Sequence, residues 1–300
     1  METMEKIAVH FLVLTVVLQW TTGFVVAMKV CPNCGPTPVP FPLSTQPDCG
    51  NQLYKVRCEL GKLWFDALNH SSYPITTINP ITQRIIVRPP GLVSKNTCMA
   101  ADFRSNGIIL DDNLPFNISG SNTIIAMNCT SEMLQMAINC SSNSLCHEYI
   151  REEPMAASAC SSLPTCCQYK TGGSPNAYRI RVRAQRCSAY VSFVNLDTSL
   201  PVSKWPQLGV EIEWALPREP MCKVQADCDG DLENSICLPD TESGIDGLRR
   251  CLCKTVFQWD PITGICQSEL FLPSLFYLSY GIISNDGVWN KRKLKFLLFF

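Results

Sequence analysis

The cysteines constrain this chain more than any other feature. All 18 of them lie between Cys31 and Cys266 in a chain of 300 residues. An even number of cysteines confined to one region is typical of disulfides that form in an oxidising, extracellular compartment. Each native disulfide stabilises a fold by roughly 2–4 kcal/mol, largely because it restricts the unfolded chain. We therefore predict that all 18 cysteines are paired.

The first 27 residues have the pattern of a secretory signal peptide. Ile7–Leu18 is an almost unbroken apolar run, and Val25-Val26-Ala27 supplies small or β-branched residues where a signal peptidase would cut. The run is shorter than the roughly 20 residues that a membrane-spanning helix needs. We predict a cleaved signal at residues 1–27, with an N-terminal membrane anchor as the alternative.

Four N-x-[ST] sequons agree with secretion. They lie at Asn69, Asn117, Asn128 and Asn139. Their clustering among cysteines and behind a signal peptide predicts N-glycosylation. The sequons at Asn128 and Asn139 have Cys in the middle position, which lowers their expected occupancy.

The composition allows a packed core. Hydrophobic residues make up 46% of the chain, and 25 Lys and Arg nearly balance 26 Asp and Glu. This balance gives no reason to expect a nucleic-acid partner.

Alternating or β-branched runs bounded by turn residues predict strands, whereas one segment has the pattern of a short helix. The expected strands are Lys55–Cys58, Gln83–Arg88, Ile124–Met127, Tyr178–Ala184 and Val210–Trp214, and the expected helix is Ser131–Ile138.

The last of these strands alternates strictly. Val210, Ile212 and Trp214 share one face, and Glu211 and Glu213 share the other, because successive side chains of a strand point to opposite faces. We therefore expect the three apolar residues to be buried.

Six cysteines near the end of the pattern form a compact group. They are Cys222, Cys228, Cys237, Cys251, Cys253 and Cys266. Their spacing, with C-x-C followed by Phe257, Trp259 and Gly264, resembles an epidermal-growth-factor-like (EGF-like) module. A cysteine count alone allows 15 connectivities. The family resemblance implies the pairs Cys222–Cys237, Cys228–Cys251 and Cys253–Cys266. The module usually has Gly before its aromatic residue, whereas Thr255-Val256 stands there in this chain.

The earlier cysteines resemble the extracellular region of plant wall-associated receptor kinases. The likeness to their galacturonan-binding domain is carried by Cys31-Pro32-Asn33-Cys34-Gly35, Val39-Pro40-Phe41-Pro42-Leu43, Cys49-Gly50 and Cys58. The likeness to the cysteine-rich region of the wall-associated kinase-like branch is carried by Cys166-Cys167, Cys187-Ser188-Ala189-Tyr190, Trp205, Glu213-Trp214 and Glu219-Pro220-Met221-Cys222.

This resemblance implies a domain order. We expect a galacturonan-binding-like domain at residues 28–115, a cysteine-rich domain at 116–217, an EGF-like module at 218–266 and a tail outside the family at 267–300. The expected fold class is mainly β and disulfide-rich, with two small β-rich, cysteine-stapled domains followed by the EGF-like module.

The tail departs from the receptor pattern. Leu270–Ile283 is apolar for 14 residues, which is shorter than the roughly 18 residues expected of a spanning segment. The run also contains Pro273. The basic run Asn290–Lys293 would suit a cytoplasmic flank. We expect release to the cell exterior or cell wall, with a membrane-anchored, kinase-less receptor as the alternative.

The sequence offers no enzyme chemistry. It contains no Gly-rich phosphate loop, catalytic-loop HRD or DFG motif. Cys31-x-x-Cys34 is not in the context of a redox pair, and disulfide-bonded sulfurs are not zinc ligands. Asp111-Asp112 would be the acid pair of a glycosidase, the alternative enzyme class, but suits a solvated turn better. Asp227–Asp231 lacks the EF-hand calcium spacing. We expect no cofactor or metal.

Rows of cations suggest a ligand. In the expected strand at 178–184, Arg179, Arg181 and Arg183 share a face with neighbours about 7 Å apart, and Lys55 and Arg57 share a face in the first domain. Such rows suit a polymer of carboxylates, and the resemblance implies pectic galacturonan.

For the Arg row, the alternative is a strand face that is simply exposed to solvent. A module that binds other extracellular proteins is the alternative function.

Overall fold

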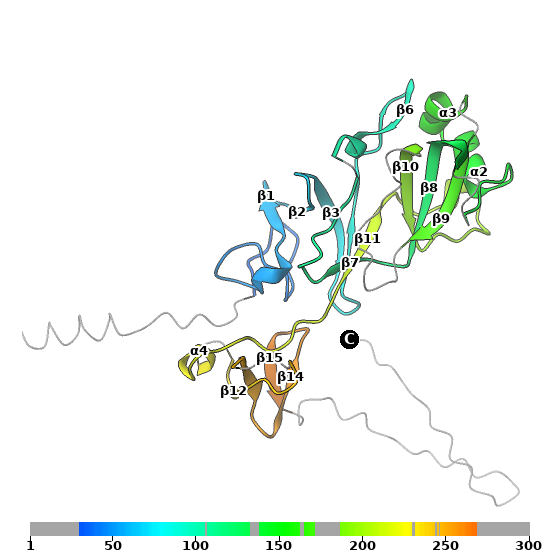
Figure 1. Cartoon of the computed structure of the whole chain (residues 1–300). Helices are drawn as coiled ribbons and strands as arrows, with labels where there is room; N and C mark the ends of the chain where they lie inside the picture. Colours follow the sequence, from blue (N-terminus) through cyan, green and yellow to red (C-terminus); the bar gives the residue numbers. More distant parts are fainter. Residues whose placement is uncertain are drawn as a thin grey trace, which may run out of the picture.

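The computed structural model describes residues 30–105, 107–132, 138–162, 165–171, 187–229, 232–243, 245 and 247–268 (Figure 1). The regular structure is mainly β with short helices, which confirms the expected fold class. The expected signal peptide, most of the expected helix Ser131–Ile138, the expected strand Tyr178–Ala184 and the apolar run Leu270–Ile283 lie outside the described residues. No helix in the described ranges is long and apolar enough to cross a membrane.

A six-stranded antiparallel sheet organises the N-terminal part of the molecule (Figure 1). Its strands in spatial order are β1 (Arg57–Glu59), β2 (Lys62–Asp66), β3 (Ser72–Asn79), β4 (Arg84–Val87), β11 (Val210–Trp214) and β7 (Phe116–Ile118). The β-branched residues of β4 favour a strand, and Pro89-Pro90 ends it because proline cannot donate to the ladder. Leu63, Phe65 and Ile85 face the buried core of this sheet.

A three-stranded sheet lies beside the large one and is covered by two helices (Figure 1). Its order is β10 (Cys187–Val194), β8 (Asn122–Cys129) and β9 (Cys166–Thr171), and the helices are α2 (Leu145–Glu152) and α3 (Pro154–Cys160). Central strand β8 packs on both sides. Ile124 and Ala126 join the core shared with the large sheet, whereas Ile125 and Met127 join the core under the helices. Burial on both faces explains its unbroken apolar run.

Short elements complete these two layers. They are η1 (Gln52–Tyr54), the hairpin of β5 (Leu92–Ser94) and β6 (Thr97–Ala100), η2 (Ala101–Ser105) and η4 (Val202–Lys204). The C-terminal module contains α4 (Ala226–Asp229) and two hairpins, β12 (Ser235–Pro239) with β13 (Arg249–Cys253), and β14 (Phe257–Asp260) with β15 (Ile265–Ser268).

The large sheet continues across the domain boundary expected at residue 115. Strands β7 and β11 belong to the second expected range, yet both pair within the sheet that β1 to β4 begin. Buried Asp102 also links the ranges, because it accepts hydrogen bonds from the hydroxyls of Tyr190 at 2.6 Å and Tyr73 at 3.4 Å. Burial raises the pKa of Asp102 despite these hydrogen bonds. The two ranges therefore share one continuous core.

Strand β11 buries more than its apolar face. Val210, Ile212 and Trp214 are buried as expected, but the side chain of Glu211 is also only 7% exposed. Its carboxylate oxygen Oε1 accepts hydrogen bonds from Ser119 at 2.8 Å, from Ser121 at 2.6 Å and from the Arg84 guanidinium. Glu213, two residues along the same strand, is 35% exposed and lies 3.7 Å from Arg84.

The EGF-like module contacts the N-terminal unit through a pair of packed aromatic side chains. The ring of Phe41 packs edge-on against Trp259 with centroids 6.5 Å apart. Gly264 lies against the same ring at a positive φ of +74°, and a Cβ placed there would stand 2.6 Å from a ring carbon. Glycine is therefore needed at this position both for its backbone conformation and for the close approach.

The 18 cysteines form nine disulfides, and none is free. Cys31 and Cys34 bond to Cys49 and Cys58, so the C-x-x-C pair is not a redox disulfide. The middle unit holds Cys98–Cys160, Cys129–Cys187, Cys140–Cys167 and Cys146–Cys166.

Candidate functional site

Strands β1 to β3, with Lys55 before β1 and Arg88 after β4, carry a charged surface on the side of the large sheet that faces away from its core, and we call this part of the sheet the outer face. Strand alternation places there Lys55, Arg57, Glu59, Lys62, Trp64, Asp66, Ser72, Pro74 and Arg88, opposite in direction to buried residues such as Leu63 and Phe65. Four of these side chains are cationic and two are acidic. The outer face therefore carries a net positive charge.

Arg57 is paired with carboxylates of the protein itself on this face. Its Nε and Nη2 atoms donate to the two carboxylate oxygens of Asp66 at 3.0 Å each, and Nη1 donates to Glu59. Its guanidinium also lies over the ring of Trp64, with Cζ 5.7 Å from the ring centroid. Two carboxylates already neutralise Arg57, so its charge is less available to an external carboxylate than the sequence suggests.

Lys55, Lys62 and Arg88 differ from Arg57 in this respect. All three side chains are exposed. Among the described residues they form no ion pair. Their charges are therefore turned to solvent.

Four residues on the outer face form a row across neighbouring strands. Arg57 is the cross-strand partner of Trp64, and Trp64 is the partner of Pro74. The backbone N–H of Arg88 donates to the carbonyl of Pro74 at 3.0 Å, which places Arg88 next in the row. We call these four residues the Trp64 row. Trp64, Pro74 and Arg88 are not recognisable as a group from the sequence, because their adjacency depends on the register of two hairpins.

An open depression of about 450 Å³ lies beside this row, lined by Arg57 and residues 66–72. Asp66 lies at its edge and accepts a hydrogen bond from Ser72 at 2.7 Å. Partial burial alone would raise the pKa of Asp66, but hydrogen bonds from Arg57 and Ser72, with the charges of Arg57 and Lys55, lower it on balance. Asp66 is therefore an anion that holds Arg57 in place.

The second expected cationic row falls outside the described residues. Arg179, Arg181 and Arg183 all lie between residues 172 and 186. Their role in ligand binding stays a prediction.

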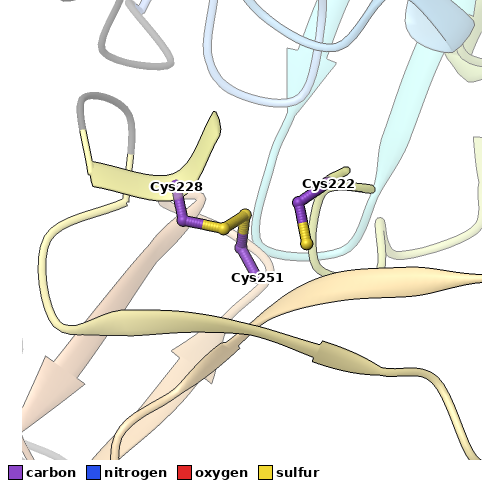
Figure 2. A group of neighbouring side chains, drawn as sticks. All are labelled: Cys222, Cys228 and Cys251. Carbon is purple, nitrogen blue, oxygen red and sulfur yellow. A yellow bond between two sulfur atoms is a disulfide. The ribbon is translucent and has the colours of Figure 1, made fainter. Parts of the chain in front are cut away.

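The EGF-like module is held by three disulfides. They are Cys222–Cys237, Cys228–Cys251 and Cys253–Cys266, the same pairs that the resemblance implies. Figure 2 shows Cys228 and Cys251 bonded, with the sulfur of Cys222 beside them. The three sulfurs lie within 4.8 Å of one another, a spacing that would suit a metal ion. All three are disulfide sulfurs rather than thiolates, so this group does not have the chemistry of a zinc site.

Comparison with known proteins finds two similar plant proteins. Over 240 residues, 79% of this chain, it is 51% identical to wall-associated receptor kinase-like 20 of Arabidopsis thaliana. It is also 51% identical over 247 residues to wall-associated receptor kinase-like 15 of the same plant. The chain is therefore similar to part of these plant wall-associated receptor kinase-like proteins. The match covers their ectodomain portion, which supports an extracellular, receptor-like role for this region.

The match extends over only part of these relatives. The chain spans 36% of the length of the first and 38% of the second. No protein-family profile matches the chain, and no solved structure matches it.

The four sequons lie in different environments. Asn69 and Asn139 are exposed, whereas Asn117 lies half-buried in β7. Asn128 is half-buried, and its Nδ2, the atom that would carry a glycan, donates to the hydroxyl of Ser188 at 2.6 Å. A glycan at Asn128 would leave Nδ2 with a single N–H for that hydrogen bond. Glycosylation at all four positions stays a prediction.

The acidic pairs have structural partners. Asp111 accepts hydrogen bonds at 2.9 Å from both the backbone and the side-chain amide of Asn113, and these lower the pKa of Asp111. Asp227 accepts the backbone N–H groups of Lys223 and Val224 at 2.7 and 3.1 Å, which lowers the pKa of Asp227. Both carboxylates therefore fix turns, as the turn interpretation expects.

Proposed function

We propose that this chain is a non-enzymatic ectodomain that binds acidic pectic polysaccharide at the cell wall. The observation that carries the proposal is the outer face, where Lys55, Lys62 and Arg88 are exposed and form no ion pair with a described residue. The names of the relatives, which associate them with the wall, support the location.

The physical basis is electrostatic. A sheet face with several exposed cations offers many shallow contacts to an extended chain of carboxylates, and each contact contributes little because solvent screens it. Attraction between exposed charges weakens beyond about 8 Å at physiological salt. Binding should therefore require a polymer of several charges and should weaken steeply as salt rises.

The test compares three polysaccharides. The full chain, produced in a eukaryotic secretory host, is titrated with polygalacturonate, with fully methyl-esterified polygalacturonate and with a neutral glucan. We expect the first to bind most tightly and to lose affinity between low and physiological salt. If the chain bound all three polysaccharides equally, or if its affinity for polygalacturonate did not depend on salt, the electrostatic proposal would be overturned.

A protein-binding role for the EGF-like module is a second candidate. Ile236 and Leu238 point outward from β12 and are 39% and 42% exposed, and Met221, bridged to Arg250 of the neighbouring strand β13, is 68% exposed. Exposed apolar side chains that gather on one hairpin are typical of interaction surfaces.

Sedimentation velocity tests this second role in its simplest form, contact between two copies of the chain. Concentration-dependent self-association that Ile236→Lys abolishes would support it. A monomer at all concentrations would rule out that form of contact.

A further inference from the structure

The structure points to one site within the outer face. We propose that a uronic-acid polymer binds across the Trp64 row, with a sugar ring packed against the part of the Trp64 indole that Arg57 leaves uncovered and a carboxylate held by Arg88. This inference rests on the proposed function and names the residues that would perform it.

The geometry of the row suits an extended ligand. Trp64 and Pro74 are cross-strand partners, and Arg88 follows Pro74 through the hydrogen bond from its backbone N–H. Neighbouring strands lie about 4.8 Å apart, so Trp64 and Arg88 begin roughly 10 Å apart. A ring and a side group of one sugar chain can therefore contact both residues at the same time. The apolar ring of Pro74 lies between them.

The two arginines of the row have different functions. Arg57 donates to Asp66 and Glu59 and lies over the Trp64 ring, so it positions that ring. A ligand carboxylate would have to displace two existing carboxylates to reach it. Arg88 is exposed and forms no ion pair with any described residue. Its planar guanidinium can hold a carboxylate through two parallel hydrogen bonds.

The exposure of Trp64 is the second argument. This indole lies half-buried in the middle of β2 on the outer face, away from the apolar core that holds Leu63 and Phe65. A rigid aromatic side chain gives a large contact area at a low entropic cost, and such residues often carry most of the energy of an interface. The cations of the outer face outnumber its carboxylates, which favours an anionic ligand over a neutral one.

The experiment uses the secreted full chain and a purified oligogalacturonide, with and without methyl esterification. The variants are Trp64→Ala, Trp64→Tyr and Arg88→Gln. The matched control is Arg151→Gln, because Arg151 is an exposed arginine on α2, away from the outer face, and forms no ion pair with a described residue. Near-ultraviolet circular dichroism and thermal unfolding confirm that each variant keeps the fold.

We expect Trp64→Ala to weaken binding by about tenfold and Trp64→Tyr to restore most of it, because stacking needs an aromatic ring. Arg88→Gln should weaken binding to the acidic ligand about threefold or more and reduce its salt dependence, with little effect on the methyl ester. Trp64→Ala should weaken both ligands, and Arg151→Gln should change neither. Bound ligand should also protect tryptophan fluorescence from acrylamide quenching in the wild type but not in Trp64→Tyr.

The failure of this site and the failure of the proposed function are distinguishable. If the wild-type chain binds the acidic ligand but Trp64→Ala and Arg88→Gln bind it equally well, the Trp64 row is not the site and the proposed function stands. If the wild type binds neither ligand, both proposals are overturned. Equal losses in Arg88→Gln and Arg151→Gln would show a general charge effect and would also overturn the assignment of Arg88.

Discussion

The buried carboxylate of Glu211 should contribute much more stability than its neighbour Glu213. Both residues lie on β11 and both pair with Arg84, but their side chains are 7% and 35% exposed. Glu211 also accepts hydrogen bonds from Ser119 and Ser121, and Ser119 is fully buried. The two glutamates therefore form a matched pair on one strand that differs in burial and in the serine hydrogen bonds made by the buried member.

The magnitude follows from what Glu211→Ala leaves behind. Removing one member of a buried ion pair typically destabilises a protein by about 3–5 kcal/mol, and an unsatisfied buried hydroxyl costs about 1–3 kcal/mol. Arg84 is 36% exposed, so water can solvate part of its freed charge. We therefore expect about 3 kcal/mol for Glu211→Ala, at the lower end. Glu213→Ala should cost at most about 1 kcal/mol, as for other exposed pairs.

Thermal unfolding followed by circular dichroism measures the difference with all disulfides intact. A loss of about 3 kcal/mol corresponds to a fall in Tm of roughly 6–12 °C for a protein of this size. Glu213→Ala should lower Tm by no more than about 4 °C. Similar small shifts for both variants would refute the argument, because burial would then not decide the contribution of these carboxylates.

Three further predictions concern the EGF-like module and the cysteines. The hydrogen bond from Arg250 to Asp240, at 2.6 Å, helps to lower the pKa of Asp240 to about 2. A depressed carboxylate pKa stabilises the fold above about pH 4, and this stability is lost as the pH falls towards 2, so Asp240→Asn should flatten the Tm profile between pH 2 and about pH 4. Gly264→Ala should lower stability by roughly 2 kcal/mol, measured by Tm, because its added methyl group would meet the ring of Phe41 and its φ is +74°; an unchanged Tm would contradict the close packing. No thiol should react with a thiol reagent in denaturant unless a reductant is added, and two or more reactive thiols would contradict complete pairing.

Local pattern predicted several elements of this fold correctly. The β-branched run before Pro89 is strand β4, and the alternating segment Val210–Trp214 is strand β11. Periodicity identifies such strands because it depends only on neighbouring residues. The three disulfides of the EGF-like module were implied by family resemblance, since spacing alone leaves the connectivity open.

Interactions between distant segments were not visible in the sequence. Glu211 is buried because Ser119 and Ser121 lie beside it, about 90 residues earlier in the chain. Arg57 was selected as a ligand-binding cation, but the turn between β1 and β2 brings Asp66, two residues beyond its cross-strand partner Trp64, within hydrogen-bonding distance, and this carboxylate neutralises much of the charge of Arg57. Alternation indicates which face a side chain occupies, whereas only strand register shows which charges meet there.

The same arrangement explains why binding and folding can be tested separately on the outer face. Apolar burial and the disulfides stabilise the opposite side of the sheet, where Cys34–Cys58 ties β1 to the N-terminal loop. Trp64 and Arg88 lie outside that core, because their side chains are on the opposite face of the sheet from Leu63 and Phe65. Surface substitutions outside the core usually change stability by less than about 0.5 kcal/mol. A loss of affinity in the Arg88 variant with an unchanged Tm would therefore report on the ligand, whereas Arg57→Gln should affect both, because Arg57 supports the Trp64 ring and two carboxylates as well as the surface charge.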